Sequence, residues 1–377
     1  MSANDSAASV EDIFGTNETI VETVEESGQK KRRWPKVLIT SFLVLLLVFG
    51  AAAAGLWFYA KNQLESMQQL GLSVEDILQE GISPDILAEG EKNADPQDLQ
   101  DAQNLTPVSY INFLILGSDS RTSAGDPTKW EAEAQRTDTI MILQISPETK
   151  HMAVMSIPRD SAVVIPGYES EGRTKLNLSY AHGGLPLTMQ TLQSISGIRI
   201  DHIMTVDFTT FTKLTDVVGG VTLTSQAEGT KTYNGKEALK FVRYRKGLPL
   251  SDRDRVRRQQ LWMRTVVNKM FSREVLSSPS KVQEVYTSIS PYVAVDNSFS
   301  LTTVLSLANA MKDADLRNTQ FVTAPTYTQT EMNKDGLEII NIDYGRFLPL
   351  CYAFQSGRAW EYISSHNLDT LDSRPVQ

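Results

Sequence analysis

Ile111-Asn-Phe-Leu-Ile-Leu116 is a short apolar run that ends at Gly117, a pattern typical of a buried strand leading into a loop. Two further runs of this kind, Thr139 to Ile145 and Met152 to Ile157, are separated by the turn Ser146-Pro-Glu-Thr-Lys150. The second and third runs predict an antiparallel hairpin. Together the three segments predict strands of a sheet, and the place of the first strand beside the hairpin stays open.

The chain after this hairpin alternates predicted helices and strands. Helices are predicted at 187–196, 209–218, 235–244 and 255–270, and strands at 202–208 and 221–224. Strands interleaved with helices predict a layered α/β domain. No shift in composition separates residues 276–377 from the rest, so the sequence predicts one domain over residues 107–377.

An apolar segment near the N-terminus predicts a membrane span. Residues 37–60 carry no charge, and at ~1.5 Å per residue such a helix covers a hydrocarbon core of ~30 Å. Lys30, Lys31, Arg32, Arg33 and Lys36 precede it, so residues 1–36 are predicted to form a cytoplasmic tail and everything after Ala60 to lie outside the cell. A cleaved signal peptide is the alternative, but the apolar run is long for one.

Residues 61–106 are predicted to form an extracytoplasmic stalk, with short helical patches and no strand. The net charge of −9 belongs mainly to this part of the chain, which has ten acids against Lys61 and Lys92. The domain that follows is close to neutral. The acidity of the chain therefore says nothing about its substrate.

Cys351 is the single cysteine, which excludes an internal disulfide and a thiolate metal cage. It is predicted to be a small buried apolar residue. His182, before Gly183 and Gly184, is predicted to be structural, and no Ser-His-Asp order suggests a nucleophilic triad.

Arginine and aspartate recur together at the ends of the predicted strands, where sites in α/β folds usually lie. Since Asp138 enters the hairpin where Arg159 leaves it, these two side chains are predicted to be neighbours. Asp119 joins them if the first strand lies beside the hairpin in a compatible direction. The three pairs are Asp119 with Arg121, Arg136 with Asp138, and Arg159 with Asp160.

The second half of the domain supplies further arginines. Arg243 and Arg245 end one predicted helix, and Asp252 opens the next in DRDRVRRQQ. The spacing of Arg255, Arg258, Gln259 and Trp262 (i, i+3, i+4 and i+7) predicts one shared helical face.

These residue types predict a phosphate or diphosphate site. The guanidinium fork makes bidentate contacts with phosphate oxygens, and carboxylates among arginines suit Mg²⁺ bound together with substrate phosphates. Any one of these residues by itself is more often part of a surface ion pair than a ligand, but several such clusters at element ends favour a site. A nucleic-acid patch at DRDRVRRQQ is disfavoured by the predicted extracytoplasmic position.

The motifs resemble those of one family, the LytR-CpsA-Psr cell-wall ligases. The resemblance covers residues 111–270 in order, through FLILGSDSR, RTDTIMIL, SIPRD, KLNLSYAHGG, VDF with FTKLTDVVGGV, NGKEALKFVRYR and DRDRVRRQQ. It implies a central twisted β-sheet flanked by helices, with a hydrophobic pocket for a polyprenyl chain. It also implies transfer of a glycopolymer, such as teichoic acid or a polysaccharide, from polyprenyl pyrophosphate to peptidoglycan.

The resemblance assigns roles by position. Asp119 and Asp138 match the family's Mg²⁺ ligands, with Mn²⁺ as the alternative ion. Arg121 is added to the pyrophosphate site because it follows the first strand directly. The remaining matches to pyrophosphate-binding and catalytic positions are Arg136, Arg159, Arg243, Arg245, Asp252, Arg255, Arg258 and Gln259. Of these, Arg136, Arg159, Asp252 and Arg255, with Asp138, are predicted to be catalytic. Arg253 and Asp254 depart from the family, which often has an uncharged pair there.

Two other functions remain open from the sequence alone. A membrane-anchored regulator or scaffold could bind lipid pyrophosphates without turnover, although the two aspartates favour an enzyme. A polyprenyl pyrophosphatase would use water in place of the peptidoglycan acceptor, and its chemistry would need the same arginines and aspartates.

Overall fold

The computed structural model describes residues 68–77, 81–118, 137–244, 247–250, 252–290 and 293–377, which belong to one compact unit, Tyr59–Gln377. The predicted tail (1–36) and membrane span (37–60) lie outside these residues. Among the helices that the structure describes, none is long and apolar enough to cross a membrane.

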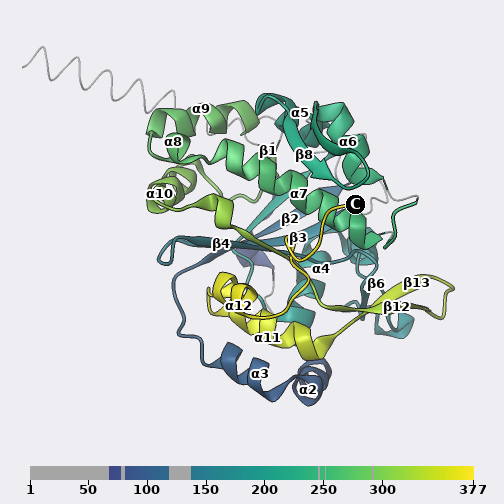
Figure 1. Cartoon of the computed structure of the whole chain (residues 1–377). Helices are drawn as coiled ribbons and strands as arrows, with labels where there is room; N and C mark the ends of the chain where they lie inside the picture. The colour runs from purple at the N-terminus through teal and green to yellow at the C-terminus, as the bar shows by residue number, and fades with distance from the viewer. Residues whose placement is uncertain (1–67, 78–80, 119–136, 245–246, 251, 291–292) are drawn as a thin grey trace, which may run out of the picture. The chain divides into compact units, whose positions relative to one another are not determined.

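A mixed sheet forms the centre of the unit (Figure 1). The strand order is β1-β10-β7-β2-β3-β4-β11. β2 pairs antiparallel with β3 and parallel with β7, and β3 pairs antiparallel with β4. The strands are β1 (Gln68–Gln69), β2 (Ile111–Ser118), β3 (Thr137–Ser146), β4 (His151–Ser156), β7 (His202–Val206), β10 (Ala294–Val295) and β11 (Gln320–Thr323).

The predicted hairpin is confirmed, since Met141 pairs with Ser156 and Ser146 with His151. The strand predicted at 221–224 also exists, but it lies outside the central sheet. The smaller two-stranded sheets are β5 (Ala162–Val163) with β6 (Thr174–Lys175), β8 (Val221–Ser225) with β9 (Gly229–Tyr233), and β12 (Thr326–Met332) with β13 (Glu338–Ile342).

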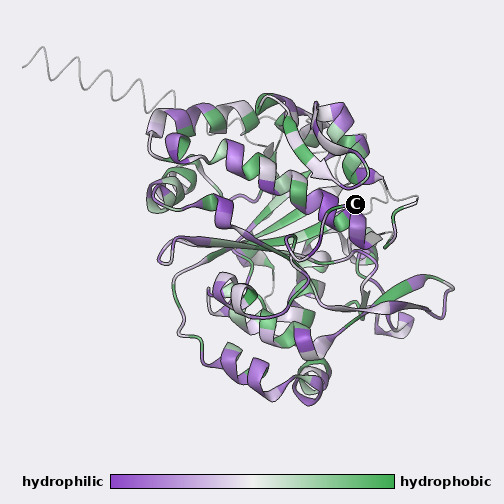
Figure 2. Cartoon of the chain, in the orientation of Figure 1, coloured by the Kyte–Doolittle hydropathy of each residue, from purple (hydrophilic) through white to green (hydrophobic). Residues whose placement is uncertain are grey.

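Helices cover both faces of the sheet, because side chains alternate along each strand. Leu114 and Leu116 of β2 belong to one apolar cluster, while Phe113 and Ile115 belong to another. Figure 2 shows the hydrophobic strands between helices whose outer surfaces are hydrophilic. The first cluster takes in α4 (Leu178–Ser196), α11 (Tyr344–Gln355) and α12 (Ala359–Ser365), and the second takes in α5 (Phe208–Val217), α6 (Gly235–Arg243), α7 (Asp252–Met270), α9 (Pro279–Ile289) and α10 (Leu301–Met311).

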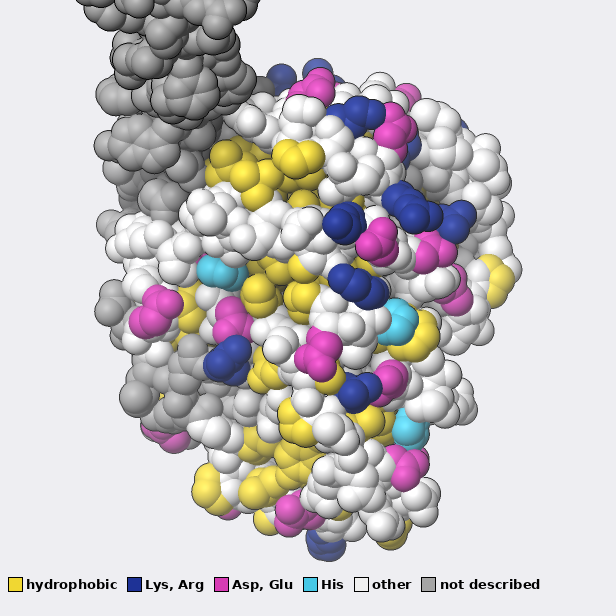
Figure 3. Space-filling model, turned by 90° about the vertical axis from the view of Figure 1, so that its left-hand side faces the viewer, with side chains coloured by type: hydrophobic (Ala, Val, Ile, Leu, Met, Phe, Trp, Pro, Cys, Tyr) yellow, Lys and Arg dark blue, Asp and Glu magenta, His cyan; other side chains and the backbone are white. Residues whose placement is uncertain are grey.

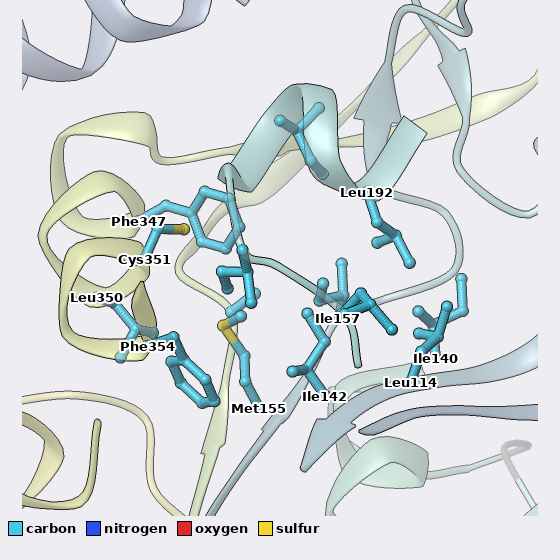
Figure 4. Packing of buried hydrophobic residues seen from close by; sticks show 14 of the residues in the cluster. Leu114, Ile140, Ile142, Met155, Ile157, Leu192, Phe347, Leu350, Cys351 and Phe354 are labelled. Carbon is cyan, nitrogen blue, oxygen red and sulfur yellow. The ribbon is translucent and has the colours of Figure 1, made fainter. Parts of the chain in front are cut away.

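The first cluster contains the single cysteine. Cys351 is fully buried on α11, and Figure 4 shows it between Phe347 and Phe354 facing the side chains of β3 and β4. Burial raises the pKa of its thiol well above the ordinary value. The prediction of a small buried apolar residue is therefore confirmed.

The predicted stalk differs from the structure over residues 68–77 and 81–106. β1 adds to the central sheet, and Val74 and Ala102 are buried in the first cluster. A Cβ at Gly90 would lie 2.8 Å from Leu348, and one at Gly345 would lie 2.4 Å from the Asn93 carbonyl, so the helices here pack closely on α11. The predicted helical patches exist, but β1 and the packing on α11 were not predicted, because these helices bury only a narrow face. They are α2 (Pro84–Asn93) and α3 (Pro96–Gln103), preceded by the 3-10 turn η1 (Val74–Asp76).

Three other short elements complete the unit. They are η3 (Glu169–Glu171), α8 (Arg273–Leu276) and η5 (Leu316–Asn318).

Candidate active site

One edge of the sheet gathers the residues that the sequence singled out. Because β2 runs antiparallel to β3 and parallel to β7, the end of β2 meets the start of β3 and the end of β7 there: Gly117 pairs with Thr139 and with Val206. A Cβ at Gly117 would lie 2.8 Å from the Thr139 side chain, so glycine permits this close approach.

A cavity of about 150 Å³ lies at this edge. Its lining combines two carboxylates, two arginines and a glutamine with apolar side chains. The residues come from the sheet (Ile115, Gly117, Asp138, Thr139, Met141, Val206), from α5 and the residue before it (Asp207, Phe208, Phe211), from α6 (Leu239, Val242, Arg243) and from α7 (Arg255, Gln259, Trp262, Met263).

Asp138 and Arg159 meet as the hairpin geometry predicts. Nη1 of Arg159 donates to Oδ1 of Asp138, and the two side chains are 16% and 24% exposed for Arg159 and Asp138. Asp160 lies beside them, with its Oδ2 3.7 Å from Nε of Arg159 and its Oδ1 2.9 Å from Nζ of Lys175. This carboxylate helps to hold Arg159 at the sheet edge.

Helix α7 brings Arg255 and Gln259 to the cavity. Arg255 is only 4% exposed, and its Nη2 lies 3.5 Å from the backbone oxygen of Asp138. Trp262, about two turns beyond Arg255, is fixed by a 2.9 Å hydrogen bond from Nε1 to Oγ1 of Thr215 and by stacking on Phe211 at 4.0 Å. This helix therefore supplies both a charged and an aromatic wall.

The shared face predicted for α7 is divided in the structure. Arg258 does not line the cavity: its Nε donates to the Gln377 carbonyl at 2.7 Å, its Nη1 donates to the Phe241 carbonyl at 3.1 Å, and it is 2% exposed. Burial lowers the pKa of Arg258 from its ordinary value. At ~100° per residue, position 258 lies ~60° from position 255, enough to turn it toward the C-terminal segment.

Arg243, at the end of α6, is exposed and reaches the cavity from the other side. Its guanidinium lies over the ring of Phe208, 4.2 Å from the centroid. Such a cation–π contact orients an arginine that has few other restraints.

The other predicted site residues lie outside the side chains that the structure describes. Asp119, Arg121, Arg136 and Arg245 lie outside the described residues, and of Asp252 only the backbone, at the start of α7, is described. The described chain stops at Ser118 and resumes at Thr137, which pair with each other beside Asp138. Within the described part of the chain, no group of three histidine, cysteine or acidic side chains could hold a metal ion.

Asp207 and Phe208 belong to the motif VDF, but the sequence analysis gave neither residue a role at the site. Asp207 is 4% exposed, and its Oδ1 accepts from the Thr210 backbone N–H at 2.6 Å, which caps α5. The available signal was an aspartate at a strand end followed by a helix. That signal identifies a cap and gives no indication of a cavity.

A second cavity, of about 210 Å³, lies between the sheet and the helices of the second cluster. Its lining is apolar apart from Thr319. It shares Ile115, Val206, Trp262 and Met263 with the polar cavity, so the two adjoin.

The fold and the site define a class: a layered α/β domain with an arginine-lined polar cavity next to an apolar one. The chain belongs to the LytR_cpsA_psr family, whose model matches residues 85–345. This membership agrees with the resemblance of the sequence motifs.

Two relatives illustrate the similarity. The chain is 30% identical over 291 residues to the polyisoprenyl-teichoic acid–peptidoglycan teichoic acid transferase TagU of Oceanobacillus iheyensis, covering 73% of this chain and 80% of that protein. It is 26% identical over 280 residues to the cell wall biosynthesis protein LcpA of Corynebacterium glutamicum, covering 62% of this chain and 53% of that protein. The chain thus spans about half the length of the corynebacterial relative.

The fold matches solved structures of lower identity. The crystal structure of Bacillus subtilis TagV superposes with a TM-score of 0.56 at 22% identity, covering 66% of this chain and 97% of that one. The prediction of a central sheet flanked by helices is confirmed at this level.

Proposed function

We propose that this chain is an extracytoplasmic phosphotransferase that moves a glycopolymer phosphate from a polyprenyl pyrophosphate to a hydroxyl group of peptidoglycan. The observation that carries the proposal is the pair of adjoining cavities, one lined by two arginines and two carboxylates and the other apolar. A lipid pyrophosphate has the same two parts. The printed name of the Oceanobacillus relative, a transferase of teichoic acid from a polyisoprenyl carrier to peptidoglycan, supports the same chemistry.

The polar cavity provides charge where the reaction needs it. The acceptor oxygen attacks the phosphorus that bears the glycan, the P–O bond to the second phosphate breaks, and polyprenyl phosphate leaves as the acceptor loses its proton. Arg255 and Arg243 line the cavity, with Arg159 at its edge on Asp138. Fixed guanidinium groups stabilise the negative charge on the leaving phosphate. Arg121, Arg136 and Arg245 remain predicted additions to this set.

The apolar cavity accounts for the lipid part of the donor. Its side chains come from the sheet and from α7, α9 and α10, and they include Phe299 and Phe321. A prenyl chain placed among them leaves water, at ~25 cal/mol per Å² of apolar surface buried. We infer that Ile115 and Trp262, shared by both cavities, contact the first prenyl units next to the pyrophosphate.

We also propose a divalent cation, Mg²⁺ or Mn²⁺, held by Asp138 and Asp119. Asp138 fits because its carboxylate lines the cavity and, among described residues, is bonded only to Arg159 through Oδ1. Carboxylates plus substrate phosphates are the usual ligands of Mg²⁺. The cation would supply further positive charge to the pyrophosphate oxygens.

We also propose that residues 37–60 anchor the domain on the outer side of the membrane. Protease treatment of wall-stripped cells tests this topology, because an anchored outer domain should be degraded. A fully protected domain would contradict it.

The proposal is tested with the full chain in detergent, because β1, α2 and α3 pack on the domain that begins near residue 107. The protein is given a synthetic polyprenyl-pyrophosphate glycan, Mg²⁺ and peptidoglycan fragments, and the products are identified by mass spectrometry. We expect glycan phosphate on peptidoglycan and an equal amount of polyprenyl phosphate, both abolished by EDTA and restored by Mg²⁺.

Two other outcomes would contradict transfer. Free glycan phosphate formed at the same rate with and without peptidoglycan would identify a pyrophosphatase. Donor that binds to the chain and is recovered unchanged would identify a regulator or scaffold.

A further inference from the structure

Asp207 is a carboxylate of the polar cavity to which the proposed transfer gives no role. It lines the cavity together with Asp138, and it is only 4% exposed. On the face of the molecule in Figure 3, by contrast, acidic side chains lie at the surface among basic ones, the usual arrangement of solvated ion pairs. Titratable side chains that line a concave cavity are the first candidates for acid–base chemistry.

The sheet places the two carboxylates on opposite sides of β2. Gly117 of β2 pairs with Thr139 of β3 and with Val206 of β7. Asp138 and Asp207 are the next residues outward on β3 and β7. Neighbouring strands lie ~4.8 Å apart, so the backbones of these two aspartates are separated by two strand spacings, ~10 Å. This separation leaves room for a phosphoryl group between the two side chains.

Positive charge gathers at the Asp138 side of the cavity. Nη1 of Arg159 donates to Oδ1 of Asp138, and Nη2 of Arg255 lies 3.5 Å from the Asp138 backbone oxygen. This environment suits the leaving phosphate, which gains negative charge as its P–O bond breaks. A carboxylate bound to a guanidinium and to the proposed cation is held in its ionised form, so Asp138 is a poor proton acceptor.

Asp207 lies on the side from which the acceptor approaches. In phosphoryl transfer the attacking and leaving oxygens lie roughly in line through the phosphorus, so a leaving phosphate near Asp138 puts the acceptor on the far side. Oδ1 of Asp207 accepts from the Thr210 backbone N–H at 2.6 Å, which fixes the carboxylate at the cavity wall. Arg243 also lines the cavity, with its guanidinium over the ring of the adjacent Phe208.

We propose that Asp207 is the general base of the transfer and accepts the proton of the acceptor hydroxyl. This inference rests on the proposed function, because it takes the cavity as the place of phosphoryl transfer. The acceptor oxygen bonds to phosphorus, its proton moves to the Asp207 carboxylate, and the P–O bond to the second phosphate breaks with its electron pair on polyprenyl phosphate. The carboxyl group then passes the proton to water. In protein kinases an aspartate likewise accepts the proton of the substrate hydroxyl.

The first variant is Asp207→Asn in the full chain. Asparagine caps a helix as well as aspartate does, so the fold is kept while the base is removed. With the synthetic donor, Mg²⁺ and peptidoglycan fragments, we expect kcat to fall ~100- to 10,000-fold, with KM and the melting temperature near wild type. The matched control is Asp343→Asn, which changes the aspartate that caps α11 and should leave kcat unchanged.

The second variant tests the proton transfer by chemical rescue. Asp207→Ser keeps a residue that can cap α5 and leaves room for a small carboxylate. Sodium formate should raise its turnover at least ~10-fold over sodium chloride of the same concentration, and should not affect the wild type. Formate that restores nothing would overturn the assignment. Rescue of Asp252→Ser and not of Asp207→Ser would identify Asp252 as the base instead.

Two wild-type measurements separate this inference from the proposed function. Wild-type protein that transfers no glycan phosphate would contradict the proposed function itself. Normal transfer by the wild type, together with equal transfer by Asp207→Asn, would overturn the base alone. Binding of farnesyl pyrophosphate should be the same in wild type and variant. A loss of binding as large as the loss of kcat would make Asp207 a donor-binding residue and also overturn the base.

Discussion

Two sides of helix α7 use the same residue type in different ways. On one side, Arg255 reaches the polar cavity beside Asp138. On the other, Arg257 is completely buried, with Nη1 donating to the Thr370 carbonyl and Nη2 to the Leu371 carbonyl, each at 2.7 Å. Arg258 binds the Gln377 carbonyl on that same side. Three arginines of one motif thus divide between a candidate site and the attachment of the C-terminal segment.

Burial alone therefore does not identify the role of an arginine on α7. Arg255 and Arg257 are 4% and 0% exposed, yet of the two only Arg255 lines the polar cavity described above. The groups that each guanidinium contacts indicate its role. Arg257 donates to backbone carbonyls that need a fixed donor, so it stabilises the fold. Arg255 lies in a cavity next to a carboxylate, so it is available to a ligand. The predictions below test this division.

Arg257→Ala should have the largest effect, and it should fall on stability. It removes the donors to Thr370, Leu371 and Arg374 and leaves buried carbonyls without partners. We expect a loss of ~3–5 kcal/mol in the free energy of unfolding, measured in urea by tryptophan fluorescence. The activity per folded molecule should not change. Arg264→Ala is the control, since its partner Asp372 is exposed, and it should cost less than ~1 kcal/mol.

Asp138→Ala should act on turnover and not on the fold. It removes the described carboxylate of the proposed cation site and the partner of Arg159. We expect turnover to fall ~100- to 1,000-fold, as when one preorganised charge-stabilising group is lost. Circular dichroism and the melting temperature should stay near wild type. Mg²⁺-dependent turnover that survives the change would remove Asp138 from the site.

Arg255→Lys should reduce turnover ~10- to 100-fold although the charge is kept, because lysine lacks the fork that grips a diphosphate. Melting temperature should change little. The comparison with Arg257→Lys sharpens the division of α7: that variant should lose stability and keep its turnover. Equal losses of turnover in the two variants would mean that the two sides of the helix have been assigned wrongly.

Phe208→Leu should have the smallest effect. It removes the ring under Arg243 and keeps an apolar side chain, so farnesyl pyrophosphate should bind about two- to fivefold more weakly. The effect should vanish in an Arg243→Gln background, which is the double-mutant test of coupling. Phe208→Trp should restore affinity. A loss of the same size with and without Arg243 would show that the ring acts by packing alone.

Much of the fold could be predicted from the sequence, because the apolar runs of β2, β3 and β4 and the turn between the last two encode the hairpin directly. The pairing of Asp138 with Arg159 followed from the same register. The local sequence pattern was enough to predict a contact wherever the two residues are neighbours in the hairpin.

What could not be predicted depends on contacts between distant segments. Nothing near residue 258 signals that Gln377 will bind it, so Arg258 resembled its neighbours on α7. Gln68 and Gln69 form β1 only because β10 offers a paired edge. Helices α2 and α3 gain their stability from α11, far away in the chain, and their own sequence has the acidic composition of a linker.

The central claim is that the two adjoining cavities bind one lipid pyrophosphate. Calorimetry with the full chain and Mg²⁺ should compare farnesyl pyrophosphate, inorganic pyrophosphate and farnesol. We predict that farnesyl pyrophosphate binds at least ~10-fold more tightly than either part, with a negative heat-capacity change from burial of its prenyl chain. Affinity equal to that of inorganic pyrophosphate, with no heat-capacity change, would contradict the claim, because the apolar cavity would then have no part in binding.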